Sequence, residues 1–149
     1  MAARLVSCQA AATGQRSLAA QVAEIAVKGF FAASELGNGA SLYRACANDA
    51  KLYDSDGNLF MDMATFADAD ACAAGMVKLM GSTRLKYSER SLNVEPDESV
   101  VVTHTVTVRD TESSSDEPVA VVRVRAQLTI DSNGKVSKAT EAVLPDSAP

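Results

Sequence analysis

The stretch SVVVTHTVTVRD, from Ser99 to Asp110, decides the fold of this chain. Valines and His104 occupy its even positions from 100 to 108, while threonines, Val101 and Arg109 occupy the odd positions. Alternation with many β-branched residues is typical of a strand that buries one face. The only histidine of the chain therefore lies in the middle of a predicted apolar face.

Three neighbouring segments have the same character. We expect strands over residues 84–94, 99–110, 119–130 and 135–144, separated by turn-forming stretches such as the acidic, serine-rich loop 111–118. The first strand alternates irregularly, which indicates a β-bulge. In the third strand Arg123 and Arg125 lie opposite the apolar residues, where they would be either solvated or part of a dimer contact.

Helical periodicity dominates the chain before residue 84. Apolar residues recur at helical spacing over residues 17–36, 40–46 and 64–80, and Asp56-Gly57 marks the turn of a hairpin over residues 50–62. The stripe expected to pack inward from the first helix consists of Leu18, Val22, Ile25, Ala26, Gly29, Phe30 and Ala33. Helices followed by an antiparallel meander predict an α+β fold with the helices on one face of the sheet.

Length and composition favour one globular domain. The 149 residues are 47% hydrophobic and 22% charged, which is enough to bury a core. We expect a single domain over residues 17–144, preceded by an arm of residues 1–16 and followed by a short tail of residues 145–149. The arm has two arginines and no acid, so it is either an organelle transit segment or a plain lead-in, and it is too weakly apolar for a secretory signal.

Charge and cysteine content argue against several classes of function. The 14 basic residues are scattered through a chain of net charge −5, without the basic stripe that a nucleic-acid surface needs. No apolar run approaches the roughly 20 residues of a membrane span. Cys8, Cys46 and Cys72 are an odd, widely spaced set, which favours reduced thiols in a cytoplasmic or organellar interior over secretion. With one histidine and no phosphate loop, we expect no metal site and no cofactor.

The order of these elements resembles the nuclear transport factor 2-like superfamily, which includes SnoaL-like polyketide cyclases and ketosteroid isomerases. The resemblance spans residues 20–143 and is carried by LGNGASLYRACANDAKLYDSDG, by the helix after the hairpin, and by the closing LTIDSNGKVSKATE. It implies a cone-shaped, cystatin-like α+β barrel, in which a curved, mostly antiparallel sheet wraps N-terminal helices in its concave face. It further implies a pocket at the wide end of the cone and, in many members, a dimer formed through the outer face of the sheet.

The resemblance also suggests one catalytic position. In NDAKLYDSDG, Asp54 matches the general base of the ketosteroid isomerases. Those enzymes also use a tyrosine and a protonated aspartate as an oxyanion hole, and the matching positions fall near Ala32 and residues 123–126, where neither residue type is present. Because the oxyanion donors supply much of such catalysis, isomerase activity of that type is not expected.

Two side chains are candidates for acid–base chemistry, and each has a simpler interpretation. His104 could act as an acid or base, since its ordinary pKa is near neutrality, or it could be a hydrogen-bonded core residue. Asp54 could be catalytic, or it could cap the hairpin turn through its side chain. The residues expected to contact a ligand, which could equally be core or surface residues, are Phe30, Tyr53, Phe60, Met76, Met80 and Tyr87.

Three functions are compatible with this sequence. The first is a ligand-binding or non-catalytic module that dimerises or joins a larger assembly. The second is an isomerase, cyclase or dehydratase that uses Asp54 and His104 on a hydrophobic small molecule. The third is a transport-factor-like peptide binder, which needs an exposed apolar groove.

Overall fold

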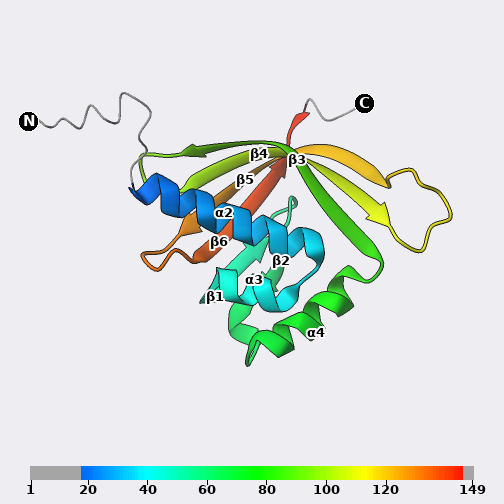
Figure 1. Ribbon diagram of the computed structural model, residues 1–149, viewed down its shortest axis with the longest axis horizontal. Helices are drawn as coiled ribbons and strands as arrows, with labels where there is room; N and C mark the ends of the chain where they lie inside the picture. The colour runs from blue at the N-terminus through cyan, green and yellow to red at the C-terminus, as the bar shows by residue number, and fades with distance from the viewer. Residues whose placement is uncertain (1–17, 146–149) are drawn as a thin grey trace, which may run out of the picture.

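A curved six-stranded sheet covered on its concave side by helices forms the body of the protein (Figure 1). The computed structural model describes residues 18–145, so the predicted arm, Cys8 and the last four residues lie outside the described part. Along the chain the elements are α2 (Leu18–Leu36), α3 (Gly39–Ala45), β1 (Cys46–Tyr53), β2 (Leu59–Asp62), a 3-10 turn η1 (Met63–Thr65), α4 (Ala69–Met80), β3 (Thr83–Val94), β4 (Val100–Asp110), β5 (Ala120–Ile130) and β6 (Val136–Val143). This architecture confirms the predicted α+β class.

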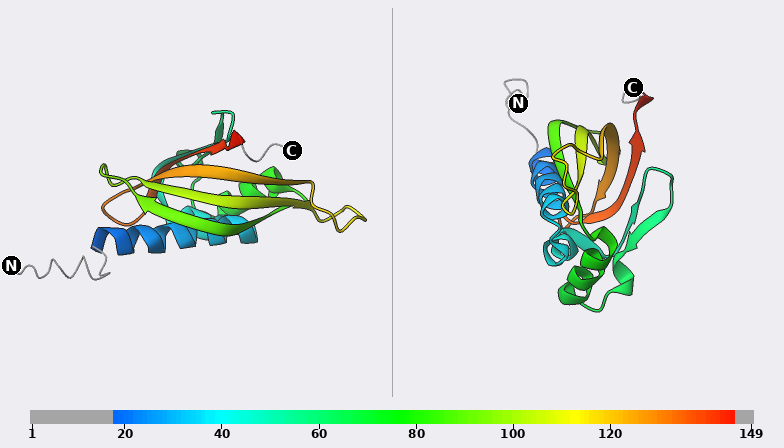
Figure 2. Two further views of the ribbon diagram at one scale, coloured as in Figure 1. Left: turned by 90° about the horizontal axis from the view of Figure 1, so that it is seen from above. Right: turned by 90° about the vertical axis from the view of Figure 1, so that its right-hand side faces the viewer.

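The strands follow the order β2-β1-β6-β5-β4-β3, and only the β1–β6 pair is parallel. The views in Figure 2 show the sheet curving around the helices. The predicted inward face of β4 is confirmed, because Val100, Val102 and His104 are completely buried. None of the helices within residues 18–145 is long and apolar enough to span a membrane.

The bulge predicted in the first long strand is present in β3. Its pairing with β4 shifts between Ser88 and Ser91, and Glu89 within the bulge adopts a left-handed backbone with a φ of 54°. One extra residue reverses the alternation, so Tyr87 before the bulge and Leu92 after it both join the inward face. The irregular spacing of apolar residues in this strand therefore reflects a real break in the ladder.

The predicted apolar stripe of α2 is wrong in its first half. Leu18 and Ile25 are 76% and 72% exposed, and the helix instead buries Ala23, Val27, Phe30, Phe31 and Ala33. Apolar residues occur on two sides of this helix, so periodicity alone could not choose between them. The side with the two phenylalanine rings faces the sheet because it buries the most apolar surface.

The predicted third helix begins too early. Residues 63–65 form only a 3-10 turn, and α4 starts after Asp68, whose carboxylate accepts a hydrogen bond from the backbone N–H of Ala71 at 2.9 Å. An N-cap of this kind fixes the first turn of a helix. Cys72 of α4 and Cys46 of β1 are buried free thiols.

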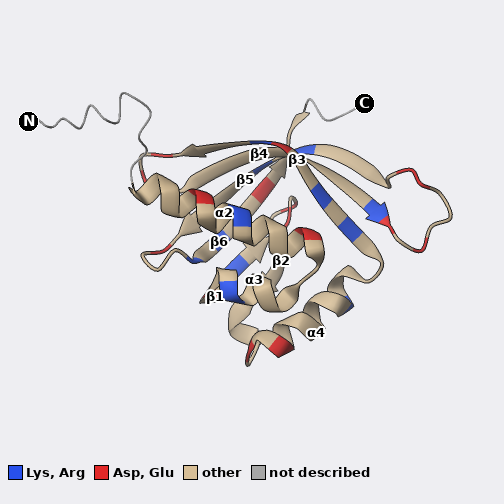
Figure 3. Ribbon diagram, in the orientation of Figure 1, with Lys and Arg blue, Asp and Glu red and all other residues tan. Residues whose placement is uncertain are grey.

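Strand alternation collects basic side chains on the outer face of the sheet. Arg84 of β3 pairs directly with Arg109 of β4, and Lys86 and Arg125 extend the same surface (Figure 3). Arg123 donates a hydrogen bond to the hydroxyl of Thr105 in this face at 3.1 Å. Two such faces placed against each other would bring like charges together, which opposes a dimer formed in this way. The dimer contact expected from the sequence stays a prediction.

Helices α3 and α4 approach most closely at Gly39, and this contact can be tested. A β-carbon at this position would lie 2.6 Å from the Cα of Ala73 and 2.7 Å from the carbonyl oxygen of Cys72. Both are backbone atoms, so the two helices would have to move apart to accommodate it. We expect Gly39→Ala to lower the free energy of unfolding by about 1–3 kcal/mol or more. Urea unfolding followed by circular dichroism measures the change.

Gly29 provides the matched control. A β-carbon there meets no atom within 4 Å, and the residue lies inside α2. Gly29→Ala should therefore raise the free energy of unfolding by about 0.5–1 kcal/mol, because alanine is the better helix former. A Gly39→Ala variant as stable as the wild type would contradict the helix contact described above.

Candidate ligand-binding cavity

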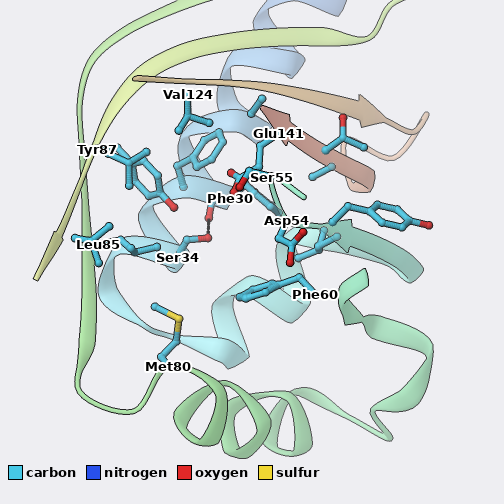
Figure 4. Close-up of a pocket in the computed structure, with 18 of the residues that line it drawn as sticks. Phe30, Ser34, Asp54, Ser55, Phe60, Met80, Leu85, Tyr87, Val124 and Glu141 are labelled. Atoms are coloured by element: carbon cyan, nitrogen blue, oxygen red, sulfur yellow. Dashed lines mark hydrogen bonds between the residues drawn. The ribbon is translucent and has the colours of Figure 1, made fainter. Parts of the chain in front are cut away.

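A cavity of about 410 Å³ lies between the concave face of the sheet and the helices (Figure 4). Buried side chains such as Leu42, Val124 and Ala126 form its inner wall. The exposed residues among its lining, which mark the side open to solvent, are Ser55, Phe60, Leu79, Glu141 and Val143. Most of the wall is apolar, so the few polar groups in it determine what chemistry the space can support.

All six residues expected to contact a ligand line this cavity: Phe30, Tyr53, Phe60, Met76, Met80 and Tyr87. They come from α2, the β1–β2 hairpin, α4 and β3, and are distant from one another in sequence. The structure thus brings these side chains to one space. Their contact with a ligand stays a prediction.

Two carboxyl groups point into the cavity from neighbouring strands. Leu52 of β1 pairs with Ala139 of β6 in the parallel register, and both face inward. Two residues further along each strand are Asp54 and Glu141, which line the same space (Figure 4). The parallel pairing therefore places two acids side by side that are almost ninety positions apart in sequence.

Asp54 both caps a turn and lines the cavity. Its Oδ1 atom accepts hydrogen bonds of 2.9 Å from the backbone N–H groups of Asp56 and Asn58. The turn role proposed from sequence is therefore present. The same residue also lines the cavity, so the turn holds one carboxylate oxygen in place at the rim of this space.

Glu141 was not singled out by the sequence analysis. Burial raises the pKa of its carboxyl, and the nearby charge of Asp54 raises it further. The Glu141 side chain is exposed to the solvent in the cavity. The protein atoms around the cavity nevertheless weaken the solvation of its negative charge. The signal that could have identified it is its alternation with Ala139 and Val143 on the inward face of β6.

Tyr87 and Ser34 supply hydroxyl groups to the cavity. Burial raises the pKa of the Tyr87 phenol, and the charge of Glu141 adds to this effect, while the Ser34 side chain opposes it. The Ser34 hydroxyl donates a hydrogen bond to the carbonyl oxygen of Phe30 at 3.0 Å, drawn as a dashed line in Figure 4. The phenol is thus a neutral hydrogen-bond donor, supplied by β3 and not by the first helix.

His104 is not among the residues that line the cavity. It is completely buried behind two that do, with ring centroids 4.7 Å from Phe31 and 4.7 Å from Tyr87. Neither imidazole nitrogen has a hydrogen-bond partner in the described part of the chain. Burial lowers its pKa to about 4, and the positive charges of Arg90 and Arg123 contribute. The ring is therefore neutral at neutral pH, and the structure does not bring it into the space that Asp54 lines.

Between residues 18 and 145 there is no group of three or more His, Cys, Asp or Glu side chains that could hold a metal ion.

Comparisons with known proteins place the fold. No protein-family model and no curated protein matches the sequence. Among solved structures, an M. tuberculosis epoxide hydrolase of the LEH-like type has a TM-score of 0.64 at 11% identity, with 85% of this chain and 86% of that chain covered. A candidate SnoaL-like polyketide cyclase from Shewanella denitrificans has a TM-score of 0.59 at 12% identity, with 89% and 94% covered. A protein of ketosteroid isomerase-like fold from Catenulispora acidiphila, in complex with trimethylamine, has a TM-score of 0.56 at 11% identity, with 82% and 87% covered.

The raised pKa of Glu141 predicts a pH-dependent stability. A carboxyl whose pKa is higher in the folded than in the unfolded chain destabilises the fold as the pH rises through that range. Glu141→Gln should therefore be more stable than the wild type near neutral pH, and the difference should vanish below the ordinary pKa of 4.5. Urea unfolding over a pH series measures this difference.

The contribution of Asp54 to the raised pKa of Glu141 can be measured separately. Asp54→Asn keeps the Oδ1 acceptor of the turn but removes the charge, so it should lower the pKa of Glu141, as measured by carboxyl NMR. Asp56→Asn removes a charge from the same hairpin outside the cavity lining and is the control. Equal effects of the two variants would contradict a direct Asp54–Glu141 interaction.

The buried His104 predicts a pH dependence of the opposite sign. Its folded-state pKa of about 4 lies below the ordinary 6.5, so the unfolded chain takes up the proton first as the pH falls. Stability should decrease between these values, by about 3 kcal/mol at 1.36 kcal/mol per pKa unit. His104→Leu should abolish this loss in urea unfolding at matched pH values. An imidazole that titrates near pH 6.5 by NMR would show that the ring is accessible.

Proposed function

We propose that this chain, whose fold is that of the nuclear transport factor 2-like superfamily, binds a small hydrophobic molecule in the cavity between its sheet and its helices. The observation that carries the proposal is a carboxyl group, Glu141, held beside Asp54 in a space that is otherwise mostly apolar. Glu141 lies on the side of the cavity that is open to solvent, where the surrounding protein atoms still raise its pKa, so a ligand beside it would meet a carboxyl group with weakened hydration. The ligand would place its polar group against these acids and its apolar body against the rings and methionines.

Size and lining support this assignment. Small-molecule sites typically measure about 300–1,000 Å³ and combine apolar walls with a few polar groups, which is the composition found here. Tyr87 and Ser34 add hydroxyl groups on the side of α2 and β3. A ligand can therefore be oriented from two sides, by carboxyl groups and by hydroxyl groups.

The structural neighbours support small-molecule binding within this fold. One is described as an epoxide hydrolase, and another was solved with trimethylamine bound. At identities of 11% these likenesses establish the fold, and function has to be argued from the residues of this chain. The assembly and dimer roles expected from the sequence remain separate proposals.

A second candidate function is acid–base catalysis on the bound molecule. A carboxylate whose pKa is raised is a stronger base than an ordinary one, which suits it to accept a proton from a substrate. Glu141 would be the proton-transferring group, Asp54 would raise its pKa, and Tyr87 would donate a hydrogen bond to a substrate oxygen. This arrangement replaces the Asp54–His104 pair expected from sequence, because His104 does not line the cavity.

Binding can be measured with a single fluorophore. The chain has no tryptophan, so Phe60→Trp introduces one reporter at the mouth of the cavity. Titration with adamantan-1-ol or octan-1-ol should shift its emission in a saturable manner. Val122→Phe, which fills the cavity from β5, should abolish the shift.

The neighbouring residue of the same strand is the control for this experiment. Val121 is 52% exposed and does not line the cavity, so Val121→Phe should leave the titration unchanged. Loss of the signal in both variants, or its survival in both, would place binding outside the cavity and overturn the proposal.

Catalysis is tested by turnover of hydrophobic epoxides and of ketones with acidic C–H bonds. If Glu141 transfers the proton, Glu141→Gln should reduce the rate by about a hundredfold or more. Asp54→Asn should move the acid limb of the pH–rate profile to lower pH, because it removes a charge that raises the pKa of Glu141. Activity that survives Glu141→Gln would exclude this residue as the base.

A further inference from the structure

The charged side chains that line the cavity are all acidic. Among the residues that line it, Asp54 and Glu141 are acidic, and there is no lysine, arginine or histidine. The remaining ionisable side chains, Tyr53 and Tyr87, are phenols. The basic residues of the strands instead lie largely on the outer face, with Arg84, Arg109 and Arg125 among them (Figure 3). The charges of the lining itself are therefore all negative, and two cations outside the lining pack on its rings: Arg90, 5.1 Å from the ring centroid of Phe31, and Lys138, 5.8 Å from that of Tyr53.

The carboxyl of Glu141 has no partner of its own in the described part of the chain. It forms no hydrogen bond and no ion pair there, and the influences on its ionisation are burial and the negative charge of Asp54. Asp54 commits its Oδ1 atom to two backbone N–H groups of the turn, and its carboxylate forms no ion pair. Both carboxyl groups thus keep acceptor capacity directed at the cavity.

Aromatic rings surround the same space. Five of the seven aromatic residues of the chain line it: Phe30, Phe31, Tyr53, Phe60 and Tyr87. The faces of such rings attract cations through their quadrupole, and rings around a cation are a common way to bind organic ammonium groups. Within the described residues, the rings of Phe30, Phe60 and Tyr87 have no protein cation over them, so they can offer a face to a positively charged ligand, independently of the two acids.

We propose that the ligand of this cavity is a hydrophobic amine, whose protonated nitrogen is held between Asp54 and Glu141 while its apolar body packs against the aromatic and methionine side chains. The inference rests on the proposed binding function and specifies the class of ligand. An ammonium group is a strong donor to carboxylates, and it offsets the repulsion between two neighbouring acids. A neutral ligand leaves that repulsion in place, and an anionic ligand increases it.

The effect of the ligand's charge on binding can be measured with three molecules that share one hydrocarbon skeleton. Adamantan-1-amine, adamantan-1-ol and adamantane-1-carboxylate have nearly equal apolar bodies, and isothermal titration calorimetry on the full wild-type chain measures their binding. Near pH 8 we expect the amine to bind at least about tenfold more tightly than the alcohol, as charge-assisted hydrogen bonds predict, and the carboxylate to bind weakest.

Lowering the pH provides a second readout. Glu141 lies beside Asp54, and Tyr87, near Glu35 and Arg90, is the other ionisable group that interacts with it. Protonation of Glu141 removes one of the two charges that hold the ammonium group. Binding of the amine should therefore weaken as the solution is made acidic, and binding of the alcohol should change much less. An amine affinity that is independent of pH down to about pH 4 would contradict the role of Glu141.

Matched variants assign the effect to the two acids. Glu141→Gln and Asp54→Asn should each weaken amine binding by about tenfold and weaken alcohol binding by a smaller factor, so the preference for the amine decreases. Asp56→Asn removes an equal charge from the same hairpin outside the lining and should leave both affinities unchanged. Circular dichroism confirms that each variant is folded.

The outcomes separate this inference from the function on which it rests. If the alcohol binds as tightly as the amine, the cavity binds neutral molecules, and the amine assignment is overturned while the proposed function stands. If the carboxylate binds best, the assignment is overturned in the same way. If none of the three binds and octylamine and octan-1-ol also fail to bind, both proposals are overturned together.

Discussion

The parallel pairing of β1 with β6 is the contact on which the rest of the structure depends. It joins the hairpin that follows the helices to the last strand of the chain, and so attaches β1 and β2 to the antiparallel meander. The same register places Asp54 and Glu141 side by side on the inward face. Parallel pairs between distant segments have to offset a large loss of chain entropy, and the apolar residues that both strands bury against the helices supply the stabilisation.

Two ionisable groups on the inward side of the sheet, His104 of β4 and Glu141 of β6, have shifted pKa values with different consequences. His104 is enclosed by Phe31 and Tyr87 and stays uncharged, so the fold avoids burying a cation near Arg90. Glu141 borders open space, where its charge depends on what occupies the cavity. As the pH falls, the first group lowers the stability of the fold and the second raises it, so the two contribute with opposite signs.

Proteins of one fold can have different functions, and the function of each depends on the residues of its site. Structures of this fold include one described as an epoxide hydrolase and one in complex with trimethylamine, so the fold alone does not specify a function. In this chain the isomerase-type donors are absent from their expected positions, while Tyr87 and Ser34 supply hydroxyl groups elsewhere. The basic residues on the outer face of the sheet, among them Arg84 and Arg109, lie on the opposite side from this cavity.

The sequence by itself determined the strands, the bulge in β3 and the inward face of β4, because alternation is a local pattern that depends only on neighbours in the chain. It misplaced the buried side of α2, where Ile25 and Val27 are equally apolar and only the sheet decides between them. Asp54 was singled out through the family resemblance and lines the cavity, whereas Glu141, which also lines it, was not singled out, and His104 lies behind the lining. A residue's role in a cavity depends on strand register and on what packs around it, and these are set by contacts between distant segments that only the tertiary structure decided.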